Sequence, residues 1–518
     1  MGWFTRGKKT PTPEPRRLPS TPTIRVAQNL ARQAVTDPII KALAERAYDA
    51  ATIGRLNGDW VVSHSDANEE LRRALRTLVA SARNMERNNS LYQKWMELLE
   101  NNVVHTGFQL RPEPRNTRGS IDKAAAKMLL DGWREWTSEP VSLDGRLYFN
   151  DLEKQILRTL VRDGEVLLVF HIRQGRLRVQ VLEGDHMPLE IHSPRDQDMV
   201  GIRLNSDRAP QGYWLLPNHP GSNLWGGSSR YSAELIPASR VAHIMKQVRP
   251  GQLRGVPWGT SAFDPLLILK GYTIAELAAA RLDASRPLGI TRDIEGTYPK
   301  DEAGDMIGVD GAAEWDGAPG TVTTFHPGET PVWSPSNHPS GQYGPFVLEI
   351  KRDIAAGLGV SYNALNSDLT SANYSSLRHG RTEEIRTYTN IQGLLARQVH
   401  QRIYEEWLKL FLLSGESSLG MIRYEKFRRV AWETPRFESI DPQKDNAADK
   451  EALDLGITSK SEVVGRRGGD YAEVLERRRL DRELEEQNGE PAPAQQTPPA
   501  TAADEEEPEG NEEDQVEE

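Results

Sequence analysis

Residues 354–381 read IAAGLGVSYNALNSDLTSANYSSLRHGR, and the rest of the chain can be organised around this stretch. An apolar helical pattern ends at two glycines, because glycine readily adopts the left-handed conformation that terminates helices. A segment rich in Ser, Thr, Asn and Tyr follows, and a much longer helical pattern begins at a Ser pair and continues to about Leu413. Before Arg378 the stretch has no Lys or Arg, and its one acid is Asp368. The pattern predicts a polar loop between two helices, which can contact a partner without binding it tightly.

The long helical pattern carries one apolar stripe. Apolar residues recur every four positions at Ile391, Leu395, Val399, Ile403, Trp407 and Phe411, which is typical of a helix that buries one face. Residues 165–172 are nearly all apolar, as in a strand covered on both faces, and 177–181 alternate, as in a half-exposed strand. Other helices are expected over 66–88, 91–99, 121–136, 150–161, 263–282 and 441–481, and other strands over 103–110, 200–204 and 212–216. This mixture predicts an α+β fold.

Composition excludes several classes of protein. The 518 residues include no cysteine, so disulfides, thiolate nucleophiles and Cys-ligated zinc are ruled out. No apolar run is long enough to cross a membrane, and the N-terminus lacks the apolar core of a secretory signal, so we expect an intracellular origin. Residues 490–518 hold eleven of the 75 acids and no base, which leaves 64 acids against 64 bases elsewhere. A body without net charge argues against a protein that grips nucleic acid through a dominant basic face.

No pattern of residues indicates catalysis. Residues 7–10, Gly-Lys-Lys-Thr, lack the upstream glycine and the preceding strand of a phosphate-binding loop. The nearest approach to a metal cluster is His186 and His192 with Asp185 and Glu190, in a short polar link after a strand. We therefore expect no catalytic, cofactor-binding or metal-binding residues.

Several short motifs together resemble one known family, the portal proteins of tailed bacteriophages, in their lambda-like branch. The motifs are Asp163-Gly164-Glu165 before an apolar strand, Gly212-Tyr213-Trp214 after a turn, RPGQLRGVPW at 249–258, AAGLGV at 355–360, and Asn373-Tyr374-Ser375-Ser376 followed by Arg378. They run in the family's order and cover roughly residues 50–415. The two termini lie outside the resemblance.

The resemblance implies a portal-type subunit with a helical stem and crown and a mixed α/β wing, assembled into a ring of twelve. By analogy the parts are a basic flexible arm (1–25), the first part of the wing (26–199), a β-rich clip candidate (200–245), the stem helix region (246–284), the second part of the wing (285–345), a helix with the channel loop (346–380), the long helix and crown (381–487), and a disordered acidic tail (488–518).

The resemblance also implies site residues. The channel loop would contain Tyr362, Asn363, Asn366, Ser367, Asp368, Thr370, Ser371, Asn373 and Tyr374. The stem helix would contain Phe263, Leu267, Lys270, Glu276 and Arg281. Each DNA phosphate that Lys or Arg neutralises adds affinity, so a loop without cations suits DNA that must slide past it.

The implied function is structural. The ring would occupy one capsid vertex of the virion after synthesis in the bacterial cytoplasm, and double-stranded DNA would pass through it during packaging and ejection. The implied partners are terminase, head–tail connector proteins, and the major capsid and scaffold proteins, with no cofactor and no membrane. Two alternatives stay open: a DNA-processing enzyme subunit, which needs a metal or nucleotide site, and a head–tail adaptor or minor capsid protein, which is usually shorter. The acidic tail has three possible roles: to repel packaged DNA, to guide a scaffold, or to keep the subunit soluble.

Overall fold

The computed structural model describes residues 64–222, 232–285, 288–292, 329–333, 341–368, 374–415, 418–435, 437, 442–466 and 471–488. The chain divides into two units, Met1–Asp66 and Ala67–Glu518, and every described helix and strand belongs to the second. The predicted basic arm lies outside the described residues, as does the predicted acidic tail beyond Asn488. Every described helix is too short or too polar to cross a lipid bilayer.

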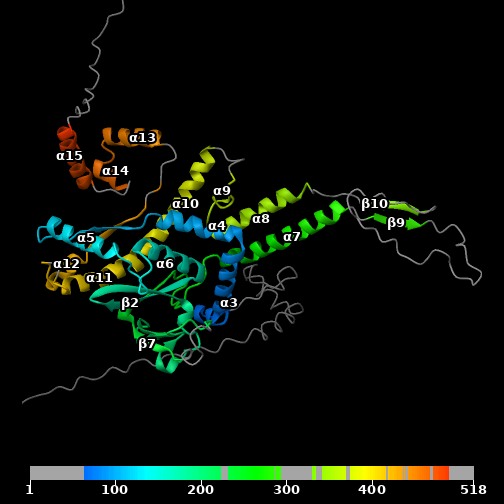
Figure 1. Cartoon of the computed structure of the whole chain (residues 1–518), viewed down its shortest axis with the longest axis horizontal. Coiled ribbons are helices and arrows are strands. Elements are labelled where there is room, and N and C mark those ends of the chain that lie inside the picture. The colour runs from blue at the N-terminus through cyan, green and yellow to red at the C-terminus, as the bar shows by residue number, and fades with distance from the viewer. Residues whose placement is uncertain are drawn as a thin grey trace, which may run out of the picture. The chain divides into compact units, whose positions relative to one another are not determined.

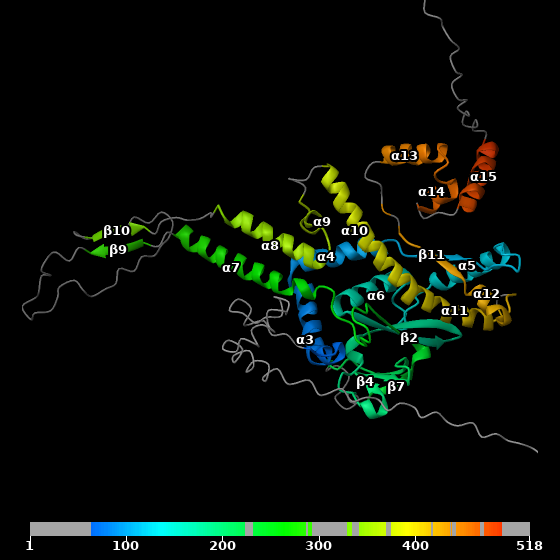
Figure 2. The same cartoon turned by 180° about the vertical axis from the view of Figure 1, so that it is seen from behind.

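Helices dominate the described elements, with small antiparallel sheets among them (Figures 1 and 2). The helices are α3 (Ala67–Asn88), α4 (Ser90–Leu99), α5 (Lys123–Thr137), α6 (Phe149–Asp163), α7 (Phe263–Ser285), α8 (Tyr343–Leu358), α9 (Tyr362–Asn366), α10 (Tyr374–Leu395), α11 (Gln401–Leu413), α12 (Tyr424–Phe427), α13 (Pro442–Asp454), α14 (Lys460–Arg466) and α15 (Tyr471–Asn488). The strands are β1 (Gln109–Pro112), β2 (Glu165–Arg173), β3 (Arg176–Glu183), β4 (Asp198–Met199), β5 (Ile202–Leu204), β6 (Pro210–Leu215), β7 (Glu234–Pro237), β8 (Val241–Met245), β9 (Leu288–Arg292), β10 (Glu329–Trp333) and β11 (Val430–Glu433). The predicted α+β class is confirmed.

Strand β2 lies at the centre of a three-stranded sheet, between β3 and β8. Side chains alternate across a strand, so Val166, Leu168 and Phe170 enter one core while Leu167 and Val169 enter another. The prediction of a strand covered on both faces is confirmed. Strand β3 has the alternating burial expected of a half-exposed strand.

The larger core gathers aromatic rings around Trp133 on α5. The Trp133 ring lies 4.9 Å from Trp136, 5.2 Å from Phe149 and 5.3 Å from Trp407, measured between ring centroids. Because α6 and α11 supply two of these rings, the core joins the first half of the chain to the long helix. Burying such large rings stabilises a fold strongly.

The clip candidate at 200–245 spans two sheets. Strands β4, β5, β6 and β7 form one antiparallel sheet, whereas β8 pairs with β2. Residues of β5 and β6 pack on Leu167 and Val169 of β2, so the two sheets share a core. The strands predicted at 200–204 and 212–216 are present as β5 and β6.

Helices α7 and α8 run antiparallel and lie side by side in both views (Figures 1 and 2). The hydroxyl of Ser261, just before α7, donates to the carbonyl of Gly357 at 2.8 Å, and the ring of Tyr272 stacks on Tyr343 at 5.8 Å. The chain between these helices includes the antiparallel pair β9 and β10.

Two local predictions differ from the structure. A strand was expected over 103–110, but α4 continues into a π turn at Glu100–Val104, and β1 begins only at Gln109. Val103 and Val104 are fully buried, so packing overrides the strand preference of β-branched residues. The expected loop after residue 360 also contains a short helix, α9, because the Ser361 side chain accepts a hydrogen bond from the N–H of Ala364 and caps it.

The long helix is present, with a π turn at Ala396–His400 between α10 and α11. The predicted stripe is buried from Ile391 to Trp407, and Phe411 is half-buried. Residues spaced by four drift around an α-helix of 3.6 residues per turn. A π turn holds more residues per turn, so it keeps the stripe on one face.

Candidate functional site

Two motifs that lie far apart in the chain meet at the start of β2. The backbone N–H of Gly255 donates to Glu165 Oε2 at 2.8 Å. Gly164 has a φ of +87°, and a Cβ there would lie 2.2 Å from the carbonyl carbon of Val256. The glycine therefore permits both the left-handed backbone and the close approach. The motif at 163–165 and the motif at 249–258 form one junction.

Arg254 occupies the middle of this junction. Its side chain is only 2% exposed, and its Nη2 lies 2.6 Å from Glu165 Oε1. The guanidinium also donates to three backbone carbonyls, those of Gly184 at 2.9 Å and of Met187 and Val200 at 3.0 Å. A buried guanidinium is tolerated only when its donors are paired. Arg254 therefore joins β2 to the chain on both sides of β4.

The ionisation of Glu165 depends on its neighbours. Burial alone would raise the pKa of this carboxyl, but the charge of Arg254 and the hydrogen bonds from His243 and Arg254 outweigh burial and lower the pKa to about 2. His243 Nε2 lies 3.0 Å from Glu165 Oε2. Glu165 is therefore ionised at neutral pH, and its charge is compensated inside the fold.

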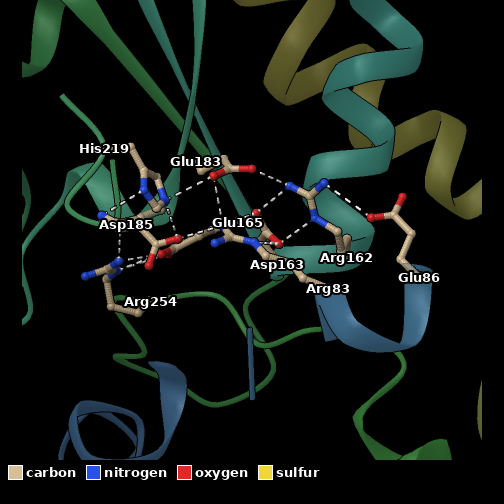
Figure 3. A network of polar contacts seen from close by, with 11 residues as sticks. Arg83, Glu86, Arg162, Asp163, Glu165, Glu183, Asp185, His219 and Arg254 are labelled. Atoms are coloured by element: carbon tan, nitrogen blue, oxygen red, sulfur yellow. Dashed lines mark hydrogen bonds and ion pairs between the residues drawn. The ribbon is translucent and has the colours of Figure 1, made fainter. Parts of the chain in front are cut away.

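A second ion-pair network adjoins the first around Asp163, which is 1% exposed (Figure 3). Arg83 Nη2 lies 2.8 Å from Asp163 Oδ2, and Arg162 Nε lies 2.7 Å from Asp163 Oδ1. Arg162 also pairs with Glu183 at 2.7 Å and with Glu86 at 3.3 Å. These pairs connect α3, α6 and the end of β3.

The four residues closest to a metal cluster in the sequence do not gather in the described part of the chain. His186 is buried, and its Nδ1 lies 2.9 Å from the carbonyl oxygen of Leu216. Burial lowers the pKa of His186, which favours its neutral form. Glu190 instead forms an exposed ion pair with Arg76 at 2.5 Å.

The structure instead brings Asp185 close to Glu183 and His219, with one potential ligand atom of each within 4.8 Å of the others. Arg83 already lies 2.6 Å from Asp185 Oδ2 and 3.1 Å from Glu183 Oε2. A guanidinium at that distance competes with any cation for the same oxygens. The cluster is part of the ion-pair network.

The described residues of the predicted channel loop form a compact unit after α8. Gly359 ends α8 with a φ of +69°, as predicted for a C-cap. The hydroxyl of Tyr362 donates to Asp368 Oδ2 at 3.0 Å, which closes the segment around α9. Tyr362, Asn363, Asn366 and Asp368 are half-buried and Ser367 is exposed. Thr370, Ser371 and Asn373 lie outside the described residues, and Tyr374 begins α10.

The loop is anchored to the long helix through Glu384. The backbone N–H of Ser361 donates to Glu384 Oε1 at 3.0 Å. Arg381 lies 3.5 Å from the other Glu384 oxygen, and it also donates to Asn102 Oδ1 at 3.0 Å. The charge of Arg381 is thus compensated within the chain.

The predicted stem residues differ in their surroundings. Phe263 is buried at the start of α7, and Glu276 is half-buried. Leu267, Lys270 and Arg281 are exposed.

A model of the family described as "Phage portal protein, lambda family" matches residues 53–392. The chain belongs to this family. The match includes α7, α8, α9 and both motifs of the buried junction. The resemblance found in the sequence is confirmed, and the expectation of a non-enzyme is confirmed with it, since the family is structural.

Individual relatives agree with the family. A probable portal protein of Halomonas phage phiHAP-1 is 26% identical over 463 residues, which covers 86% of this chain and 89% of the relative. Portal protein B of Escherichia phage lambda is 22% identical over 446 residues, covering 76% of this chain and 81% of the relative. Among solved structures, the virion of a native gene transfer agent particle contains a chain that matches with a TM-score of 0.42 and 12% identity, covering 77% of this chain and 94% of the other.

Proposed function

We propose that this family member forms a ring at one vertex of a bacteriophage capsid, and that double-stranded DNA passes through the ring during packaging and ejection. The family match over 53–392 carries the proposal. The resemblance implies twelve subunits, and the ring would be a component of the virion. A ring closes only if each subunit has two different, complementary faces.

The composition of the polar loop after α8 favours a surface along which DNA slides over one that binds DNA tightly. Residues 354–377 contain no Lys or Arg. Arg378 is the first cation of α10, and Arg381, three residues further along the helix, is compensated by Glu384. Cations that neutralise phosphates would make DNA binding tight and salt-dependent. A surface of hydroxyl and amide groups with one acid lets DNA slide, so we place 361–375 against the bore.

Partner docking is a further part of the proposal. Terminase and head–tail connector proteins would bind the clip, and major capsid and scaffold proteins would contact other faces of the ring. The clip predicted at 200–245 remains a candidate. The β9–β10 pair is a second candidate, because it belongs to the connection between two antiparallel helices, whereas β5 and β6 pack on the sheet of β2.

Electron microscopy of the purified protein tests the proposal. We expect rings with a central hole, since isolated subunits leave an apolar stripe of α7 exposed. Monodisperse monomers that hydrolyse ATP or DNA would instead support a DNA-processing enzyme.

The substitution Asp368→Lys tests whether the loop faces DNA. A cation at this position would attract the phosphates of passing DNA, so packaging should slow or stall in an assay of DNA protected inside capsids. Asp368→Asn is the control, because it removes the charge and keeps an acceptor for Tyr362; it should package normally. Unchanged packaging by Asp368→Lys would argue against a loop that faces the bore.

A further inference from the structure

Helix α7 has an exposed apolar stripe. Phe263, Leu266 and Leu269 are buried within the subunit, but another set of residues points away from it. Leu267, Ile274 and Leu277 are 54%, 58% and 56% exposed, and Lys270 and Arg281 continue the same line. The spacing of these five residues alternates between three and four, which places them on one helix face. We call them the α7 stripe.

Residues at the start of helix α8, together with Tyr272 of α7, form an exposed groove. Tyr272, Gln342, Pro345, Phe346 and Glu349 line a largely apolar hollow of about 510 Å³. Phe346 is half exposed, and the Tyr272 ring packs edge-on against it at 5.0 Å. The groove has an apolar floor with a carboxylate at one end. We call it the α8 groove.

The antiparallel packing of α7 and α8 sets which residues lie at the same height. Ser261 is level with Gly357, and Tyr272 is level with Phe346. Counting along both helices from these pairs places Lys270 beside residues 348–349. The same count places Ile274 near Pro345.

We propose that the α7 stripe of one subunit packs into the α8 groove of the next subunit in the ring, with Lys270 facing Glu349 and Ile274 lying against Phe346. This inference rests on the proposed ring and adds its contact residues. Subunits in a closed ring are related by rotation, so residues at the same height meet when the two helices run along the ring axis.

Charge and shape favour a second copy as the occupant. The α7 stripe carries two cations among its apolar residues, and the α8 groove ends at Glu349. Glu349 pairs with Arg352 at 2.6 Å inside the subunit, but both side chains are more than half exposed, so this pair contributes little and Glu349 can accept Lys270 as well. The stripe and the groove are different surfaces of one chain, as a ring interface requires.

Reversing charges tests the contact. Lys270→Glu and Glu349→Lys should each lower the ring fraction, with the concentration for half-assembly rising roughly fivefold or more at low salt. The double variant should recover most of the loss, because it restores opposite charges in the reverse order. Mass photometry measures the ring fraction, and Lys127→Glu, at an exposed position of α5, serves as a charge-reversal control. A double variant whose loss is the sum of the two single losses would overturn the Lys270–Glu349 pairing, even though the wild type forms rings.

Cross-linking provides a second test, because the chain has no cysteine to compete. Lys270→Cys and Glu349→Cys subunits are mixed, assembled and oxidised. A disulfide requires Cα atoms within about 7 Å. The proposed packing places residues 270 and 349 face to face across the contact, so covalent dimers are expected. In the control, Arg281→Cys takes the place of Lys270→Cys. Residue 281 lies eleven residues further along α7, or about 16 Å along the helix axis, so it should be too far from residue 349 to form dimers. Rings that form without cross-linking at 270 and 349 would overturn the inference and leave the proposed function standing. A wild-type protein that forms no rings would contradict both this inference and the proposed function.

Discussion

The variant Arg254→Met is expected to lower the free energy of unfolding by about 3–5 kcal/mol, because it leaves an ionised carboxylate buried without its partner. Glu165 is 2% exposed, and Arg254 supplies three of its hydrogen bonds. The substitution also removes the donors to Gly184, Met187 and Val200. Urea unfolding of the unassembled subunit, followed by tryptophan fluorescence, measures the loss.

The matched control is Arg76→Met. Arg76 also pairs with a glutamate, but the two side chains are 62% and 60% exposed, so the change should stay within about 0.5 kcal/mol. The pair Glu165→Gln with Arg254→Met should be less destabilised than the sum of the single changes, by about 0.5–3 kcal/mol. If Arg254→Met and Arg76→Met cost the same, the buried pair does not stabilise the junction.

Gly164→Ala is expected to destabilise the subunit by about 2–5 kcal/mol. A left-handed backbone costs a residue with a Cβ roughly 1–2 kcal/mol, and the new Cβ would lie 2.2 Å from a backbone carbon of Val256. Backbone moves less readily than a side-chain tip, so the overpacking adds about 1–3 kcal/mol. The same unfolding assay applies.

Gly175→Ala separates the two contributions. Gly175 also has a positive φ, of +75°, but no atom lies within 4 Å of the position a Cβ would take. Its cost should be the conformational part alone, about 1–2 kcal/mol. Equal losses at the two glycines would show that the approach of Val256 is not tight in solution.

Patterns along the chain predicted the elements whose burial is regular. Strand β2 was predicted from its apolar run, and the long helix from the spacing of its apolar residues, so the periods of strand and helix were sufficient. The segment at 103–110 failed because Val103 and Val104 are buried in a π turn, and no local pattern predicts a helix that extends by packing. Helix α9 depends on the N-cap hydrogen bond that Ser361 accepts. In a segment so rich in Ser, Thr and Asn, the sequence did not single out Ser361 as a cap.

The buried junction shows a different limit. Its two motifs were recognised separately, yet nothing in either one indicated that Glu165 would meet Arg254. An acid that opens a nearly all-apolar strand was the available signal, since a buried carboxylate requires a cation. Only the three-dimensional structure identifies Arg254 as that cation among the 64 Lys and Arg residues of the chain. The clustering of Asp185 with Glu183 and His219 was missed for the same reason, because residue 219 reaches them through tertiary structure.

The link between Glu165 and Arg254 also sets an order of events during biosynthesis. The two residues are separated by 89 positions, so at roughly 5–20 residues per second the ribosome adds Arg254 about 4–18 s after Glu165. Throughout that interval β2 has no cation from Arg254 to compensate its first residue, and burying that carboxylate alone is unfavourable. The nascent sheet should therefore mature late, only after the segment that follows β8 has been synthesised. A subunit of the proposed ring would therefore become competent to assemble only after Arg254, close to the middle of the 518-residue chain, has been made.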